Sequence, residues 1–256
     1  MNTEHPTNNA ESHAGNLLRE SFSQVFSKVV VLTNMIYPTG PGAAVKSTEM
    51  DAIVVCSAGV FVFEVKGWHN CTVRREKSDT GESQWSLIDR HNGYSKQVRD
   101  PLQQIGGKLK VLTPLVQEAL LVHLAHHTTE IAQVVDALSG DGLGDRVTQS
   151  VRDVVSKIKQ PVIRSRSYVL LPMHGVEVGM NIPPMVLTSR ELPYLVRQLA
   201  HECRRKGNVC VPFSDAMVDC VARELEKAGT VISHSDHLSN VHEIHGGCEK
   251  ALGIAA

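Results

Sequence analysis

The stretch that decides the fold is residues 48–66, TEMDAIVVCSAGVFVFEVK. Its two halves are rich in β-branched and aromatic residues, and the short connection Cys56-Ser57-Ala58-Gly59 separates them. This pattern predicts two antiparallel strands, 52–55 and 60–66, that are joined as a β-hairpin.

The charged residues of this hairpin are predicted to share one face. If the turn is centred on Ser57 and Ala58, Asp51 lies opposite Glu64 and Glu49 lies opposite Lys66. Because side chains alternate along a strand, these four groups project from the face that also carries an apolar patch. That patch consists of Ile53, Val55, Val60 and Val62, and the opposite face carries no charge. Two apolar faces indicate a central hairpin.

Two facing carboxylates at the end of an apolar hairpin repel each other unless a proton or a cation neutralises them. Mg²⁺ binds carboxylate oxygens and keeps several waters that phosphate can replace. A metal held by Asp51 and Glu64, with Lys66 beside it, therefore predicts a phosphodiesterase site. The pattern alone leaves an alternative, in which Glu49 pairs with Lys66 at a solvated hairpin end and the other two carboxylates point into water.

The rest of the chain predicts a mixed α/β core. We expect a helix at 11–26, a strand at 28–32, a loop at 38–47, and strands at 72–75 and 85–88. A helix should open at Asp100-Pro101 and a second one at Thr113-Pro114, with helical sequence to about 159. Strands at 167–171 and 185–188 and helices at 189–202 and 214–227 follow, before a polar, His-rich tail at 230–256.

The bulk composition limits the classes of protein. With 256 residues, 42% of them apolar, the chain can bury a substantial core. No apolar run reaches the roughly 18 residues needed to span a bilayer, and residues 1–13 lack the apolar stretch of a signal peptide. Six cysteines without paired spacing suggest reduced thiols and a cytoplasmic location. A net charge of −1 argues against a protein that coats nucleic acid, but not against an enzyme that holds a short length of backbone.

Several motifs resemble the nuclease-related domain (NERD) family, a branch of the PD-(D/E)XK phosphodiesterases. They are EMD at 49–51, GVFVFEVKGW at 59–68, Trp85 and DPLQQ at 100–104. The resemblance covers about 14–112 and 165–200. It implies a restriction-endonuclease-like mixed sheet flanked by helices. It also implies Asp51 and Glu64 as metal ligands, the carbonyl of Val65 as a third, Lys66 as the catalytic lysine and Gln104 as a catalytic glutamine near the site.

One position departs from the family pattern. The family carries Gly-Glu at the start of its first helix, whereas this chain has Gly15-Asn16. Either Glu11 or Glu20 substitutes from a neighbouring turn, or the acidic residue is missing, which would weaken a metal site. We therefore keep two hypotheses: a nuclease dependent on Mg²⁺ or Mn²⁺ that hydrolyses DNA, and a catalytically impaired nuclease-like module that binds partners or acts as a scaffold.

The sequence also predicts a division of the chain. We expect a flexible tail at 1–10, a nuclease core at 11–112 plus 161–202, a helical insertion at 113–160, and a C-terminal helix with the His-rich tail at 203–256. The expected partner is nucleic acid and not a membrane. The apolar residues Leu120, Leu121 and Leu124 suggest a homo-oligomer formed through the insertion.

Two further groups could bind zinc. His123, His127 and Glu130 share a helical stripe, but they lack the H-E-x-x-H order and are better interpreted as a polar helix face. The tail contains His234, Asp236, His237, His242, His245 and Cys248. Their spacing matches no defined ligand pattern, so a zinc protein organised by the tail is a third and weaker hypothesis.

Overall fold

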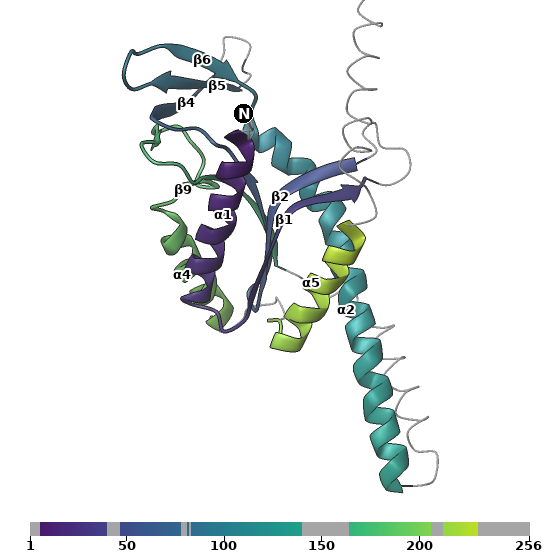
Figure 1. Cartoon of the computed structure of the whole chain (residues 1–256). Coiled ribbons are helices and arrows are strands. Elements are labelled where there is room, and N and C mark those ends of the chain that lie inside the picture. Colours follow the sequence, from purple (N-terminus) through teal and green to yellow (C-terminus); the bar gives the residue numbers. More distant parts are fainter. Residues whose placement is uncertain are drawn as a thin grey trace, which may run out of the picture.

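The computed structural model describes residues 6–39, 47–77, 81, 83–139, 164–205 and 212–229. These residues form a mixed α/β fold in which helices cover two sheets (Figure 1). The helices are α1 (Pro6–Ser23), α2 (Pro101–Ser139), α4 (Leu192–Arg204) and α5 (Asp215–Gly229). The strands are β1 (Val29–Pro38), β2 (Ser47–Cys56), β3 (Gly59–Val65), β4 (Cys71–Lys77), β5 (Ser83–Asp89), β6 (Ser95–Val98), β7 (Ser165–Leu171), β8 (Glu177–Val178) and β9 (Val186–Thr188).

The predicted hairpin lies at the centre of the larger sheet, and its register is confirmed. Ile53 pairs with Val62 and Val55 with Val60, and the last pair is Cys56 with Gly59, so only two residues form the turn. Gly59 is required at the start of β3 because its φ is 132° and its backbone passes close to Arg164. The N–H of Val60 donates to the Arg164 carbonyl at 3.0 Å. These contacts connect the hairpin to β7 and fix which residues face each other.

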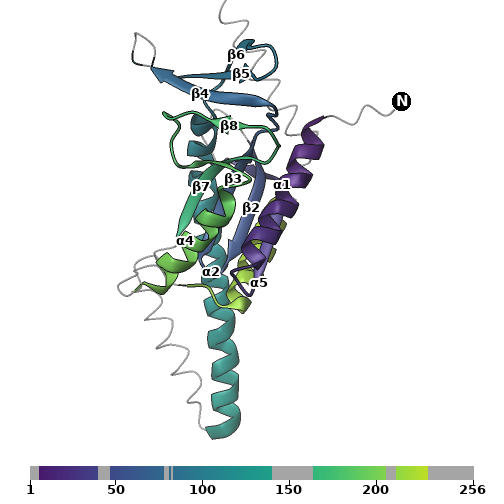
Figure 2. The ribbon, with the colours of Figure 1, turned by 90° about the vertical axis from the view of Figure 1, so that its left-hand side faces the viewer.

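The larger sheet has the strand order β1-β2-β3-β7-β9. Its first three strands are antiparallel, whereas β7 and β9 run parallel to β3. Helices α1 and α4 lie on one face and α2 and α5 on the other (Figures 1 and 2). Phe61 and Phe63 face α1, whereas Ile53 and Val62 face α2 and α5. Both faces of the hairpin are therefore buried, as its two apolar faces predicted.

A smaller sheet, with the order β6-β5-β4-β8, lies beyond one end of the larger sheet (Figure 2). A separate core cluster joins the two sheets and the start of α2. In this cluster Val73 and Trp85 pack with Ile105 of α2 and with Val169 of β7. This cluster holds the first turns of α2 against the end of the larger sheet.

Several predicted element boundaries differ from the structure, and two of the differences have a clear physical cause. β1 extends to Pro38 instead of ending at 32, because it pairs with β2 over nearly its whole length. Thr113-Pro114 does not start a second helix, since α2 continues through Pro114. Proline removes one helical hydrogen bond. Leu112 and Val116, on either side of it, are nevertheless both buried in the core shared with the hairpin, and this packing keeps the helix continuous.

The predicted division into a nuclease core and a helical insertion stays a prediction. Helix α2 nevertheless crosses the expected boundary at 113 as one helix. Residues 140–163 and the His-rich tail at 230–256 lie outside the described residues. Of the three leucines proposed for oligomerisation, Leu120 is buried in the chain's own core, whereas Leu121 is 47% exposed.

Among the described residues, no helix combines the length and the apolar character needed to cross a membrane. The described cysteines, Cys56, Cys71, Cys203 and Cys220, are free thiols. Burial raises the pKa of the Cys56 thiol to about 12, so this residue is an inert part of the core. The cytoplasmic location stays a prediction.

Gly59→Ala is expected to destabilise the protein by about 2–4 kcal/mol, because the new methyl group would lie 2.1 Å from the Arg164 carbonyl oxygen at a backbone conformation that favours glycine. Urea unfolding measures the change. Gly106→Ala is the matched control, since a methyl group there meets no atom within 4 Å and should stabilise α2 by about 0.5–1 kcal/mol. Equal stabilities of the two variants would contradict this account.

Candidate active site

Asp51 and Glu64 lie together at the end of the central hairpin, on the face covered by α2. Lys108 of α2 joins them, because its Nζ donates to Asp51 Oδ1 at 3.2 Å and also to Glu64 Oε2. Lys66 Nζ donates to the other Glu64 oxygen, Oε1, at 2.7 Å. The second Asp51 oxygen, Oδ2, accepts the backbone N–H of Val65 at 2.7 Å. Every oxygen of the two carboxylates therefore has a donor.

This charged cluster is withdrawn from water. The side chains of Glu64, Lys108 and Asp51 are only 7, 9 and 14% exposed, and Lys66 is 21% exposed. Burial by itself would raise the pKa of Glu64, but the charges and hydrogen bonds of Lys108 and Lys66 lower it overall. Burial opposes the charge of Lys108 as well, yet Asp51 and Glu64 raise its pKa. The Glu64 carboxylate and the Lys108 ammonium are thus both held in their charged forms.

The structure therefore decides between the two interpretations of the hairpin end. Lys66 pairs with Glu64, Glu64 is buried, and the Asp51 side chain is only 14% exposed. The solvated alternative required both carboxylates to point into water, so it is wrong. A bound metal is also not needed for neutrality, because Lys66 and Lys108 already balance the charges of the two carboxylates.

Lys108 is the residue that sequence reasoning missed. It occupies a buried position on the face of α2 that packs against the sheet, and the other members of this stripe are apolar. They are Pro101, Ile105, Leu112, Val116 and Ala119. A lysine at an inward position of an amphipathic helix was the available signal, since a buried amine needs an acidic partner.

Gln104 lies one helical turn before Lys108 and is exposed. None of the hydrogen bonds found among the described residues joins it to Asp51, Glu64 or Lys66. Its predicted role therefore stays a prediction that rests on its position on α2.

The acidic residue of α1 nearest to the cluster is Glu11, not the residue after Gly15. Glu11 is half-buried, and its pKa is raised by burial and by the carboxylates of Asp51 and Glu49. Asn16 is exposed and accepts a hydrogen bond from Arg19 at 3.1 Å. Glu20 is exposed and lies two and a half turns further along the helix, about 13 Å from Glu11. Of the two substitutes expected from the sequence, the structure favours Glu11.

The carboxylate chemistry fits a divalent cation. Asp51 Oδ1 and Glu64 Oε2 already converge on one cationic group, the Lys108 ammonium. The Val65 N–H points toward Asp51, and in an extended strand the carbonyl of the same residue points to that side too. A hard cation such as Mg²⁺ prefers such oxygen ligands and completes its shell with water. Within the described residues, however, no three His, Cys, Asp or Glu side chains form a ready metal-binding cluster.

The zinc hypothesis receives no support from the described part of the chain. His123 and His127 stack edge to face with their ring centroids 4.7 Å apart. No group of three metal-binding side chains includes them among the described residues. The side chain of Glu130 and the His-rich tail lie outside those residues.

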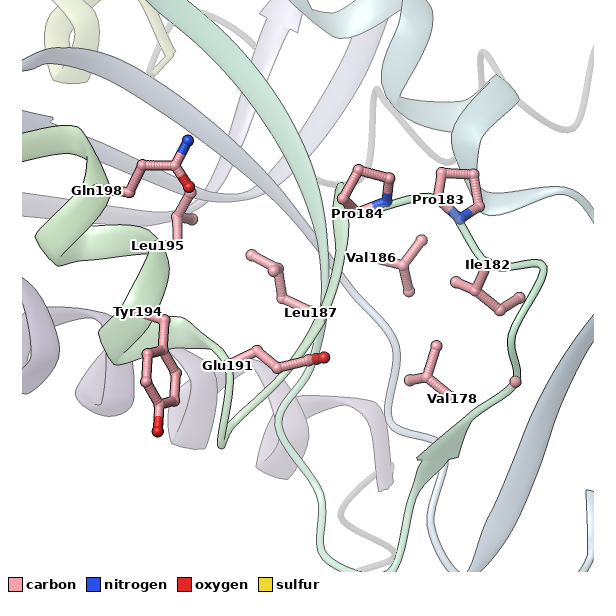
Figure 3. Close-up of a pocket in the computed structure, with 11 residues that line it drawn as sticks. Val178, Ile182, Pro183, Pro184, Val186, Leu187, Glu191, Tyr194, Leu195 and Gln198 are labelled. Carbon is pink, nitrogen blue, oxygen red and sulfur yellow. The ribbon is translucent and has the colours of Figure 1, made fainter. Parts of the chain in front are cut away.

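Two adjoining cavities lie at the sheet edge beside β9. One, of about 340 Å³, is lined by Ile182, Pro183 and Pro184 on one side and by Tyr194 and Gln198 of α4 on the other (Figure 3). The second, of about 410 Å³, shares Pro184 and Gln198 and reaches Leu109 of α2. Together the cavities connect α4 with the helix that carries Lys108.

The register of the parallel strands relates this edge to the charged cluster. Glu64 pairs with Val169, which pairs with Val186 beside the first cavity. Two strand spacings correspond to about 10 Å between the Cα atoms of Glu64 and Val186. The cavities and the charged cluster therefore lie two strands apart in the same sheet.

Residues 6–132 match the sequence model of the nuclease-related domain family, NERD. The chain contains a nuclease-related domain. The match includes Glu11, Asp51, Glu64, Lys66 and Lys108, and it continues into the segment expected to be an insertion. No curated protein and no solved structure matches the chain significantly.

A nuclease-related function follows from this family, and the two sheets with their flanking helices are compatible with a nuclease-like fold of the PD-(D/E)XK superfamily. Strands β7 and β9 and helix α4 lie beyond the matched part of the nuclease-related domain. The cavities at the sheet edge therefore belong mostly to the part of the chain that the match does not cover.

Glu64→Gln is expected to destabilise the nuclease-related domain by about 3 kcal/mol at pH 7, because it leaves Lys108 and Lys66 with less compensating charge. The folded-state pKa of Glu64 is lowered, so its stabilisation is present above the ordinary value of 4.5 and is lost as the pH falls below it. Urea unfolding should thus show the difference between wild type and variant shrinking toward about pH 3.

The control for this experiment is Glu177→Gln. Glu177 pairs with Arg90 on the surface, where both side chains are about half exposed. Its effect should stay within about 0.5 kcal/mol at every pH. A Glu64→Gln effect of the same size would contradict the buried ion network.

Proposed function

We propose that the chain is a metal-dependent nuclease that hydrolyses phosphodiester bonds of DNA. One observation carries the proposal: two carboxylates and two lysines, all largely withdrawn from water, converge at the end of the hairpin, inside the part that matches the family. Converging charged groups with shifted pKa values in a buried place are typical of catalytic sites.

In the proposed site Asp51, Glu64 and the Val65 carbonyl hold Mg²⁺ or Mn²⁺. The metal supplies Lewis-acid stabilisation of the phosphate and lowers the pKa of a bound water. Lys66, which donates to Glu64 at 2.7 Å, keeps that carboxylate oriented and charged. Its ammonium is also the more exposed of the two lysines and is placed to contact a phosphate oxygen. Gln104, exposed on α2 one turn before Lys108, is proposed to orient the substrate.

The exposed face of α4 is the proposed contact for the nucleic acid strand. Tyr194, Arg197, His201 and Arg204 are all exposed and follow one another at helical spacing, so they share one face. The Arg197 guanidinium lies over the Tyr194 ring, 4.9 Å from its centroid. Cationic side chains that bind phosphate, beside an aromatic ring on which a base can stack, are a common arrangement for binding single strands.

Asp51→Asn and Lys66→Met should each lower the rate of DNA cleavage by at least about 100-fold, because each removes a group that stabilises the reacting phosphate. The measurement uses plasmid, linear duplex and single-stranded DNA with Mg²⁺ or Mn²⁺, and with EDTA as the metal-free sample. Glu177→Gln, which removes a surface carboxylate, should cleave like the wild type. Cleavage that persists in Asp51→Asn would refute the proposed site.

The second candidate function is a nuclease-like binding or scaffold module. It is favoured by the same charged cluster, because all four carboxylate oxygens already have donors from the protein and the charges of the four side chains balance. A module of this kind would bind DNA in a gel-shift assay but would cleave none of the substrates, with or without metal. Metal-dependent cleavage by the wild type excludes this candidate.

Tyr194→Ala is expected to weaken DNA binding about 10-fold, since one stacked base contributes about 1–3 kcal/mol. The cleavage rate at saturating substrate should stay near that of the wild type. Fluorescence anisotropy with a single-stranded oligonucleotide and cleavage kinetics measure the two effects. Tyr94→Ala is a matched control, because Tyr94 is 69% exposed and Tyr194 is 68% exposed. If both variants bind like the wild type, α4 is not the contact surface.

A further inference from the structure

The Lys108 ammonium occupies the position between Asp51 and Glu64 in which a divalent cation would bind. We propose that Lys108 is a resident cation of this site, and that a metal ion binds only after displacing its ammonium. This inference rests on the proposed metal site and adds a residue that controls how readily that site is loaded.

The hydrogen bonds of the two carboxylates support this role. Asp51 Oδ2 is engaged by the Val65 N–H, and Glu64 Oε1 is engaged by Lys66. The other two oxygens, Asp51 Oδ1 and Glu64 Oε2, converge on Lys108 alone among the contacts found in the described residues. These two oxygens are also the pair best placed to bind one metal ion together, so the ammonium and the metal compete for the same ligands.

The balance of charge leads to the same conclusion. Asp51 and Glu64 carry two negative charges, and Lys66 and Lys108 carry two positive charges, in a region only 7–21% exposed. A divalent ion bound beside both ammonium groups would give the buried cluster an excess of positive charge. Such an excess is costly where water cannot screen it. Removal of the Lys108 ammonium from between the carboxylates lowers that cost.

The hydrogen bonds of Lys108 found among the described residues are all made by its terminal ammonium. Its helix is fixed by Ile105 and Leu112, which are fully packed on either side of it along the buried stripe. The amine itself is carried on a flexible four-carbon chain. Glu11 lies within electrostatic range of Lys108, and its half-buried carboxylate offers an alternative partner for the displaced ammonium. The backbone of α2 therefore need not shift when the ammonium leaves.

The test compares Mn²⁺ binding by the full chain and its Lys108→Met variant, with isothermal calorimetry and with melting curves recorded in EDTA and in Mn²⁺. In EDTA the variant should melt below the wild type, because two carboxylates lose their shared cation. In Mn²⁺ the variant should regain most of this loss, and it should bind Mn²⁺ on the order of ten-fold more tightly than the wild type. Lys110→Met, an exposed change on the same helix, should behave like the wild type in both measurements.

A second variant, Lys108→Gln, keeps the test valid if Lys108→Met does not fold. It keeps a hydrogen-bond donor for the carboxylates but removes the charge, and it should show the same gain in Mn²⁺ affinity. Adding Glu64→Gln to either variant should abolish the gain, which places the bound ion at these carboxylates. The inference is overturned if the Lys108 variants bind Mn²⁺ no more tightly than the wild type, or do not bind it.

These readouts do not depend on DNA cleavage, so the inference and the nuclease proposal can fail separately. A gain in Mn²⁺ affinity with no cleavage by any variant supports the resident cation and refutes the nuclease. Metal-dependent cleavage that requires Asp51, together with equal Mn²⁺ affinity in wild type and Lys108→Met, supports the nuclease and refutes the resident cation.

Discussion

The register of the β2–β3 hairpin is the constraint on which the rest of the structure depends. With a two-residue turn, Ile53 pairs with Val62, and Asp51 and Glu64 then follow on the same face at the open end. A slip of β3 by one residue would turn Glu64 toward α1, away from Asp51, and would turn Phe61 and Phe63 toward α2. Both apolar faces would then be mismatched with their helices. The same packing that stabilises the sheet therefore fixes the position of the two acids.

The charged cluster lies where the backbone pairing of β2 and β3 ends. β3 is antiparallel to β2 but parallel to β7, so β7 and β9 continue the sheet on its other side. Beyond the last β2–β3 pair, the Val65 N–H has no partner on β2 backbone and is bound by the Asp51 side chain instead. The carboxylate thus completes the ladder where the backbone pairing ends, and this bond holds it in a single orientation.

The sequence was sufficient for features that depend on neighbouring residues. The hairpin register follows from the alternation on both sides of Ser57-Ala58, and the start of α2 follows from Asp100 and Pro101. Asp100 does cap this helix, because the Leu102 N–H donates to Asp100 Oδ1 at 2.8 Å. Local turn chemistry and side-chain period determine these features, so they can be recognised without knowledge of the tertiary contacts.

Features that depend on how distant segments pack were missed. Pro114 should interrupt α2 locally, but burial of Leu112 and Val116 against the hairpin outweighs one lost hydrogen bond. The role of Lys108 becomes apparent only when α2 lies over the end of β3, because its partner Glu64 is more than forty residues away in the sequence. Glu11 could not be distinguished from Glu20 without the angle at which α1 crosses β1 and β2. In each case the feature is determined by contacts between residues that are distant in the sequence.

The charged cluster is better explained by function than by stability. A buried ion network of this kind contributes little compared with apolar side chains of the same size, because the cost of removing the charges from water offsets their attraction. The surrounding stripe of α2 shows that apolar residues fit there, since Ile105 and Leu112 flank Lys108 within the core. A sequence under pressure for stability alone would have little reason to keep Asp51, Glu64 and Lys108 between them. Three charged groups retained where the pairing of β2 and β3 ends, within a nuclease-related domain, fit the proposed site for an exchangeable cation and a phosphate.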